Sequence, residues 1–305
     1  MRILRDPEHL EPCVLVLGMF DGVHRGHQAL LMRGRERALA LGVPLCVCTF
    51  EPHPLAVLRP EGQPPRLTTQ TERARLMASY GVDVLCVRSF TRRLSKQSPE
   101  DFVADMVRRC HPRAVVSGFN YTFGDRGAGT CETLRALGEK YGYESITVPE
   151  VVLEGATVSS TRIRRLLEQG ELHLATYLLG HAYTLSGRVE GGKHIGRTMG
   201  FPTANVRVPA HKALPAFGVY ACYLTVDGRS LPAVVNVGRH PTLPEGKVTV
   251  EAYVLDRRID LYGKPVRLTF MSYRRPERSF ESVEALRAQI RQDASDARAY
   301  FASLR

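Results

Sequence analysis

The stretch that most constrains this fold is residues 18–27, with the sequence GMFDGVHRGH. An apolar run at residues 13–17 precedes it, and a helix-compatible segment begins near residue 28. This order predicts a buried strand, a short turn and a helix that starts directly after it. The first N–H groups of such a helix lack partners, and the helix dipole is positive at this end. We therefore expect the junction to favour an anion such as phosphate.

Glycines and histidines recur within this stretch. Gly18, Gly22 and Gly26 allow the backbone to approach a ligand closely. His24 and His27 are three residues apart, so both rings can face one cluster of oxygen atoms if the segment is turn-like or helical. The pattern suits a nucleoside triphosphate, although a glycine-rich turn with two surface histidines would have the same composition.

Strand and helix patterns alternate through the first half of the chain. We expect strands at residues 13–17, 43–50, 82–87, 114–117 and 144–148, and helices at 28–41, 71–80, 99–110 and 130–141. A further helix is expected to begin after the hydroxyls of residues 159–161 and to continue through residues 166–179. This alternation predicts a parallel sheet with helices on both faces. Ligands of such sheets bind outside the carboxyl ends of the strands, where residues 18–27 are expected.

After residue 180 the pattern changes to short strands bounded by glycine and proline. We expect these strands at residues 183–190, 218–226, 229–237, 248–255 and 265–272, followed by a helix at about 282–303. Asp227-Gly228 lies between two of them and is a strong hairpin signal. The chain is thus predicted to form an α/β domain, residues 1–180, and a small antiparallel β-barrel domain, residues 181–305.

Composition indicates a soluble protein of the cytoplasm. The length of 305 residues exceeds that of a usual single domain. No apolar run approaches the ~20 residues that span a bilayer, and the amino terminus does not continue into a signal-peptide core. The seven cysteines are scattered without a Cys-x-x-Cys pair, so we expect reduced thiols that lie mostly in the core.

The positive charge of the chain is concentrated in its second half. Residues 1–180 contain 23 basic and 20 acidic side chains, whereas residues 181–305 contain 19 basic and 11 acidic ones. Such a field attracts either small anionic substrates or nucleic acid. The sequence has no recognised nucleic-acid motif and no stripe of aromatic and basic residues, so we expect no nucleic-acid partner.

Seven motifs carry a family resemblance. His24-Arg25-Gly26-His27 resembles the His-x-Gly-His motif of the nucleotidylyltransferases, and the longer string from Gly18 to Gln28 resembles the bacterial bifunctional riboflavin kinase/FAD synthetase family. The other matching segments follow in the expected order, at residues 49–54, 118–127, 159–164, 196–205, 251–263 and 275–280. The resemblance covers residues 16–297 and is therefore very specific.

This resemblance implies a Rossmann-like nucleotidylyltransferase domain followed by a riboflavin kinase barrel. The barrel would phosphorylate riboflavin with ATP to FMN. The first domain would adenylylate FMN with a second ATP to FAD and pyrophosphate. Riboflavin, FMN, FAD and ATP are the implied ligands, Mg²⁺ is the implied cofactor, and the oligomeric state is not implied.

In the first domain the family motifs place the ATP and FMN contacts at Gly18, Phe20, Asp21, Gly22, His24, His27, Asn120, Ser159, Ser160, Thr161 and Arg164. His27 and Arg164 are the implied catalytic residues. Arg164 would stabilise the negative charge that develops on pyrophosphate. The hydroxyls of residues 159–161 are equally typical of plain helix capping.

In the second domain the motifs place the binding residues at Gly192, Lys193, Arg197, Thr203, Asn205, Arg275 and Glu277. Thr203 and Asn205 would hold the magnesium–ATP complex, since Mg²⁺ prefers oxygen ligands. Glu251 aligns with the family's proposed base, although an isolated glutamate on a strand is usually a surface residue. Tyr253 stands where the family usually has histidine.

Two other functions fit parts of this pattern. The His-x-Gly-His motif alone would permit an adenylyltransferase for another phosphorylated acceptor, with the barrel as a binding module. The basic second half alone would permit a nucleic-acid-binding protein, whose affinity would fall steeply with salt.

Overall fold

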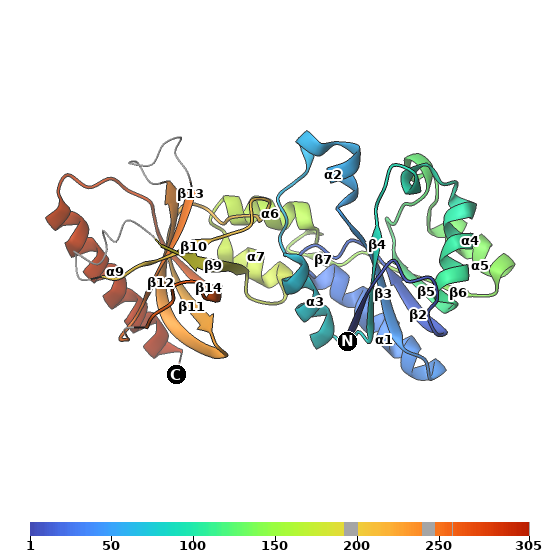
Figure 1. Cartoon of the computed structure of the whole chain (residues 1–305), viewed down its shortest axis with the longest axis horizontal. Coiled ribbons are helices and arrows are strands. Elements are labelled where there is room, and N and C mark those ends of the chain that lie inside the picture. The colour runs from blue at the N-terminus through green and yellow to red at the C-terminus, as the bar shows by residue number, and fades with distance from the viewer. Residues whose placement is uncertain (192–200, 240–247, 258, 305) are drawn as a thin grey trace. The chain divides into compact units, whose positions relative to one another are not determined.

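The computed structural model describes residues 1–191, 201–239, 248–257 and 259–304 (Figure 1). The chain forms two compact units. The first comprises Met1–Pro64 and Gln70–Ser160, and the second comprises Pro65–Thr69 and Thr161–Arg305.

The first unit is built on a six-stranded parallel sheet, as the alternating pattern predicts. The strand order is β1-β4-β3-β2-β5-β6, with β1 Arg2–Arg5, β2 Cys13–Leu17, β3 Leu45–Glu51, β4 Val84–Ser89, β5 Pro112–Gly118 and β6 Glu144–Val148. The larger helices are α1 Arg25–Leu41, α3 Gln70–Ser79, α4 Pro99–Cys110 and α5 Cys131–Tyr141. Shorter elements are α2 Pro54–Leu58, the 3₁₀ turns Pro60–Gly62, Leu94–Lys96 and Asp125–Gly127, and the hairpin of β7 Val152–Leu153 and β8 Ala156–Thr157.

The central strand β2 separates two hydrophobic cores because its side chains alternate between the faces of the sheet. Val14 and Val16 pack in the core that includes residues of α1 and α3. Leu15 and Leu17 pack in the core that includes residues of α4 and α5. All five residues of β2 are buried, and each large aliphatic side chain contributes about 1.5–3 kcal/mol on burial. The predicted parallel sheet with helices on both faces is confirmed.

The direction of winding reverses beside β2. The chain runs from β2 outward through β3 to β4 and then returns to β5 on the other side of β2. Ligands of open α/β sheets bind at such a reversal, outside the carboxyl ends of the strands. Residues 18–24 follow β2 and residues 119–124 follow β5, so both segments lie at this edge of the sheet.

Helix α1 begins earlier than the sequence pattern predicts. It starts at Arg25, with His24 as the residue before its first turn, instead of near residue 28. Gly26 and His27 therefore belong to the first helical turn. The glycines lower the helical signal there, and the tertiary environment overrides this weak local preference.

Gly34 lets α1 approach the sheet closely. A Cβ atom at this position would lie 2.6 Å from Cγ2 of Val16 and 2.9 Å from Cδ1 of Leu45. We expect Gly34→Ala to lower the free energy of unfolding by about 1–3 kcal/mol, because this overpacking exceeds the gain in helix propensity. Urea unfolding followed by circular dichroism measures the change. Arg33→Ala, at an exposed position of the same helix, should stay within about 0.5 kcal/mol of the wild type, and a higher midpoint for Gly34→Ala would contradict this packing.

The second unit is a closed antiparallel barrel, which confirms the predicted barrel. Its order is β10-β13-β12-β11-β14-β9, with β9 Thr184–Glu190, β10 Ala204–Arg207, β11 Gly218–Val226, β12 Arg229–Arg239, β13 Val248–Val254 and β14 Pro265–Pro276. The carboxyl-terminal helix α9 Val283–Ser303 packs Ala297 and Phe301 against Ala221 and Tyr223 of the barrel. Helices α6 Ser160–Glu168 and α7 Leu172–Leu179 precede the barrel.

A five-residue segment of the first half, Pro65–Thr69, is built into the second unit. The N–H of Arg66 donates to the carbonyl of His211 at 2.6 Å, and the carbonyl of Arg66 accepts from Ala213 at 2.8 Å. The buried Lys212 donates from Nζ to the carbonyl of Leu67. The chain therefore passes between the two units at three places.

Four strands have no counterpart in the sequence prediction: the two-residue strands β7 and β8, and the strands β1 and β10. β1 is an edge strand of four largely exposed residues, so it lacks an apolar pattern. β10 follows Pro202-Thr203, and the sequence alone indicates a turn there. β1 and β10 are ordered by pairing with distant partners, β1 with β4 and β10 with β9 and β13.

All seven cysteines are buried and unpaired, as the sequence predicts. Among the described residues, no helix combines the length and apolar character needed to cross a bilayer.

Candidate active sites

The loop between β2 and α1 has a backbone that most sequences avoid. Phe20 and Val23 have φ values of 54° and 41°, in the left-handed region, and Gly22 has a φ of 84°. The side chains of Phe20 and Val23 are fully buried. Non-glycine residues in this region cost of order 1–3 kcal/mol and persist where the surroundings hold them, often at ligand sites.

Side chains from three other places in the chain hold this loop. They donate hydrogen bonds to its carbonyl groups: Arg73 to Met19 at 3.0 Å, Ser160 to Asp21 at 2.8 Å and Gln28 to Val23 at 2.8 Å. The loop is therefore organised before any ligand binds, which lowers the entropic cost of binding.

The two histidines of the motif stack on each other. The ring centroids of His24 and His27 are 3.7 Å apart with an interplanar angle of 23°, and the Phe20 ring lies 5.1 Å from that of His27. Burial holds the pKa of His27 well below its usual range, and the neighbouring His24 and Arg73 lower it further. Nδ1 of His27 is buried and makes no hydrogen bond within the described part of the chain. His27 is thus a neutral imidazole at pH 7.

This lowered pKa predicts a loss of stability in mild acid. Between the folded pKa of His27 and the unfolded value near 6.5, the unfolded chain binds a proton that the native chain does not. The free energy of unfolding therefore rises with pH in this window and falls as the pH drops below about 6.5. We expect a smaller fall between about pH 7 and pH 5 in His27→Gln than in the wild type. Urea unfolding at both pH values tests this, and equal falls would contradict the assignment.

The structure brings Asn120 and Ser160 to the same unit as the loop. Asn120 is exposed in the turn after β5, and its Oδ1 lies 3.7 Å from the point where a Cβ on Gly118 would be. Ser160 reaches the loop through its hydrogen bond to Asp21, 139 residues earlier. Ser159 is half-buried beside it.

Thr161 and Arg164 lie in the second unit, on the early turns of α6. Nη1 of Arg164 lies 3.5 Å from the hydroxyl of Thr161. That Arg164 and His27 act together in adenylyl transfer stays a prediction.

In the barrel, strand register brings Glu251 and Asn205 together. Glu251 of β13 is directly opposite Asn205 of β10 on one side and Asn236 of β12 on the other. Directly opposed residues place their side chains on the same face with Cβ atoms roughly 4.5–5.5 Å apart. Two predicted site residues 46 positions apart are therefore neighbours, and Thr203 lies two residues before Asn205. Asn205, Glu251 and Asn236 form one row across three strands, and no sequence motif indicated Asn236.

The row lies on the outer face of the barrel. The neighbours of Glu251 along β13, Val250 and Ala252, are buried. Tyr253, two residues after Glu251, packs in the cluster that contains residues of α9 and meets the Phe201 ring edge-on at 5.4 Å. The half-buried carboxylate of Glu251 is thus on the outer face of the barrel, between two amide side chains.

Arg275 and Glu277 both have protein partners. Nε and Nη2 of Arg275 donate to the two oxygens of Asp293 in α9, at 2.8 and 2.7 Å. The carboxylate of Glu277 lies against Gly238 and accepts the N–H of Arg239 at 3.4 Å. Arg275 therefore links β14 to α9. The predicted residues Gly192, Lys193 and Arg197 lie outside the described residues.

Known proteins resemble the chain along its whole length. The family model for FAD synthetase matches residues 6–162, and that for riboflavin kinase matches residues 179–301. The bifunctional riboflavin kinase/FMN adenylyltransferases of Listeria monocytogenes and Escherichia coli K12 are each 38% identical to it. The first alignment covers 95% of this chain and 93% of the relative, and the second covers 99% and 98%. This chain belongs to the bifunctional riboflavin kinase/FMN adenylyltransferase family.

A solved structure has the same fold as this member of the family. It is described as a macrolide-efflux protein from Streptococcus pneumoniae, is 30% identical, and superposes with a TM-score of 0.89 over 98% of this chain and 99% of its own. The resemblance found in the sequence motifs is confirmed.

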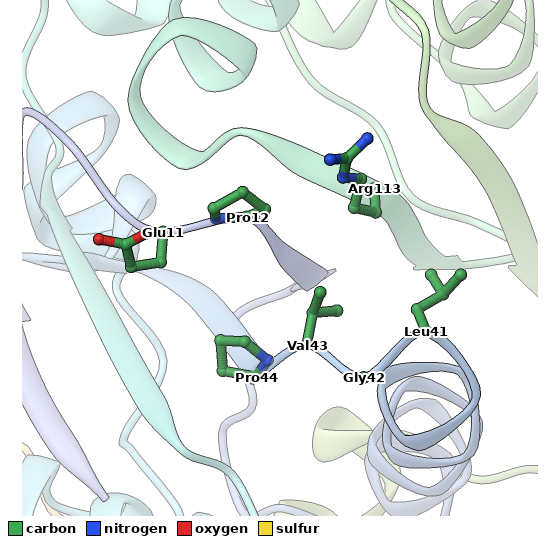
Figure 2. Close-up of a pocket in the computed structure, with 7 residues that line it drawn as sticks. All are labelled: Glu11, Pro12, Leu41, Gly42, Val43, Pro44 and Arg113. Atoms are coloured by element: carbon green, nitrogen blue, oxygen red, sulfur yellow. The ribbon is translucent and has the colours of Figure 1, made fainter.

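One pocket of this family member lies in the first unit, away from the loop with the histidines (Figure 2). It has a volume of about 520 Å³ and is lined by Glu11, Pro12, Leu41, Gly42, Val43, Pro44 and Arg113. Pro12 and Pro44 directly precede β2 and β3, so the pocket lies at the amino ends of the strands. The loop with the histidines lies at the opposite ends.

Metal-binding side chains do not cluster in the part of the chain that the structure describes: it holds no group of three or more His, Cys, Asp or Glu residues able to bind a metal ion. The row of Asn205 and Glu251, with Thr203 nearby, instead offers amide, carboxylate and hydroxyl oxygens. Such oxygens suit Mg²⁺, which usually completes its coordination with substrate phosphates and water.

Proposed function

We propose that residues 1–180 adenylylate FMN and residues 181–305 phosphorylate riboflavin. In the kinase reaction the terminal ribityl hydroxyl attacks the γ-phosphorus of ATP and ADP leaves. In the adenylyltransferase reaction a phosphate oxygen of FMN attacks the α-phosphorus of another ATP and pyrophosphate leaves. Each domain thus uses one ATP, and the product of one site is the substrate of the other.

Glu251 is the proposed proton acceptor of the kinase reaction. A carboxylate beside the ribityl hydroxyl accepts its proton as phosphoryl transfer proceeds, although positioning and charge neutralisation contribute more than basicity. The amides of Asn205 and Asn236 flank this carboxylate, which supports the assignment.

Thr203 and Asn205 are the residues proposed to hold magnesium with ATP. The oxygen donors of this set fit a hard cation. When bound, Mg²⁺ would neutralise charge on the transferring phosphates. Arg275 and Glu277 would border the flavin, with Arg275 oriented by Asp293.

In the adenylyltransferase site the loop of Gly18, Phe20, Asp21 and Gly22 is proposed to hold the triphosphate at the start of α1. His24 and His27 would donate to its oxygens, and Asn120, Ser159, Ser160 and Thr161 would contact ATP or the flavin phosphate. Arg164 would stabilise the charge on pyrophosphate. The buried, neutral His27 at a helix N-terminus carries this part of the proposal.

We infer that the enzyme works in the cytoplasm with these small ligands and without nucleic acid. The seven unpaired cysteines support a reducing compartment.

One experiment tests the proposed function. The pure protein is incubated with riboflavin, ATP and magnesium, and the flavins are separated by chromatography over time. We expect FMN first and FAD afterwards, and FAD alone when FMN is supplied. FMN without FAD would indicate an adenylyltransferase for another acceptor, and no change in riboflavin would refute the kinase assignment.

A further inference from the structure

Arg73 is a buried cation that belongs to none of the family motifs recognised in the sequence. It lies on α3 with only 4% of its surface exposed. A buried guanidinium is costly unless charged or polar partners surround it. Arg75, two residues further along the same helix, is exposed, so the burial of Arg73 is specific to its position.

The guanidinium of Arg73 connects two motif segments. Its Nη1 donates to the carbonyl of Met19 in the loop before α1 at 3.0 Å, and its Nη2 lies 3.4 Å from Oε2 of Glu51 at the end of β3. The hydroxyl of Thr49 donates to the same Met19 carbonyl at 3.3 Å. Only a planar fork with several N–H groups can span both partners in fixed directions.

Arg73 also acts electrostatically on His27, the candidate catalytic residue in the first turn of α1. Its positive charge lowers the pKa of His27, in addition to the larger effect of burial and that of His24. Among the described residues, His24 from the loop and Arg73 from α3 are the titratable or charged groups that act on His27 in this way.

We propose that Arg73 is a positioning residue for adenylyl transfer: it fastens the loop of residues 18–24 to the end of β3 and thereby sets the position of His27. It acts through Met19 and Glu51 and does not itself touch the substrate. This inference rests on the function proposed for residues 1–180.

The test uses the full-length chain and the variants Arg73→Gln, Arg73→Lys and Arg75→Gln. A displaced catalytic group commonly costs about 10²-fold in rate, so we expect Arg73→Gln to lower kcat for FAD formation by about 10²-fold, with a smaller change in KM for FMN. Arg73→Lys keeps the charge but not the fork, and about a 10-fold loss is expected. Arg75→Gln should match the wild type, and riboflavin phosphorylation should persist in all three.

A second readout needs no substrate. The Cε1 proton of His27, assigned by its absence in His27→Asn, is titrated by NMR in each variant. The midpoint should move to higher pH in Arg73→Gln, where the cation is gone, and stay near the wild-type value in Arg73→Lys.

Three results would overturn the proposal: wild-type kcat for FAD formation in Arg73→Gln, an unchanged His27 titration in that variant, or equal loss of both activities in Arg73→Gln and Arg73→Lys. A wild-type chain that makes no FAD would instead refute the proposed function. The His27 titration would still decide whether Arg73 acts on the loop.

Discussion

Glu251→Gln is expected to lower riboflavin phosphorylation by about 10²-fold or more, while FAD formation from supplied FMN continues. The substitution keeps the shape of the side chain but removes the proton acceptor and its charge. Chromatography of the flavins after incubation with riboflavin, ATP and magnesium measures the loss.

Glu190→Gln is the matched control for this experiment. Glu190 of β9 is the other strand neighbour of Asn205 and forms an ion pair with Arg207 at 2.9 Å. Like Glu251 it is an acidic residue directly opposite Asn205, but it is not opposite Asn236. We expect this variant to keep kinase activity. Equal losses in Glu190→Gln and Glu251→Gln would show that general charge, and not the position of Glu251, is responsible.

His27→Ala is expected to reduce FAD formation by about 10²–10³-fold and leave riboflavin phosphorylation nearly intact, so that FMN accumulates. Removing one preorganised donor to developing negative charge commonly has an effect of this size. The interaction strengthens as charge moves onto pyrophosphate, so kcat should fall more than the affinity for FMN. Arg164→Ala should have the same signature.

Exposed residues of the same types provide the controls. His173→Ala and Arg165→Ala alter a surface histidine and the neighbour of Arg164 on α6, and both should make FAD at the wild-type rate. Wild-type FAD formation in folded His27→Ala and Arg164→Ala would refute the site assignment. Loss of both reactions in either variant would indicate unfolding instead.

Local sequence was sufficient for the elements whose burial repeats with a regular period. The strand pattern at residues 13–17 and the alternation after residue 180 led to the parallel sheet and the barrel, because hydrophobic periodicity is set by near neighbours in the chain. His27 and Glu251 were proposed as site residues from a different signal, the resemblance of short strings of side chains to the motifs of the family.

Tertiary structure alone decided which distant residues share a site. Arg73 and Asn236 look like ordinary surface residues in the sequence, because the partners that define them, Met19 and Glu251, lie 54 and 15 positions away. Strand register also places Asn205 beside Glu251.

Long-range contacts also fixed elements that have no local pattern. The start of α1 at Arg25, the edge strand β1 and the segment Pro65–Thr69 in the second unit all depend on partners far along the chain. The sequence by itself determined the fold class, the buried thiols and the family. Only the folded chain determined the row around Glu251 and the support that Arg73 gives to the loop of residues 18–24, because cross-strand pairing and the burial of a charge depend on the whole fold.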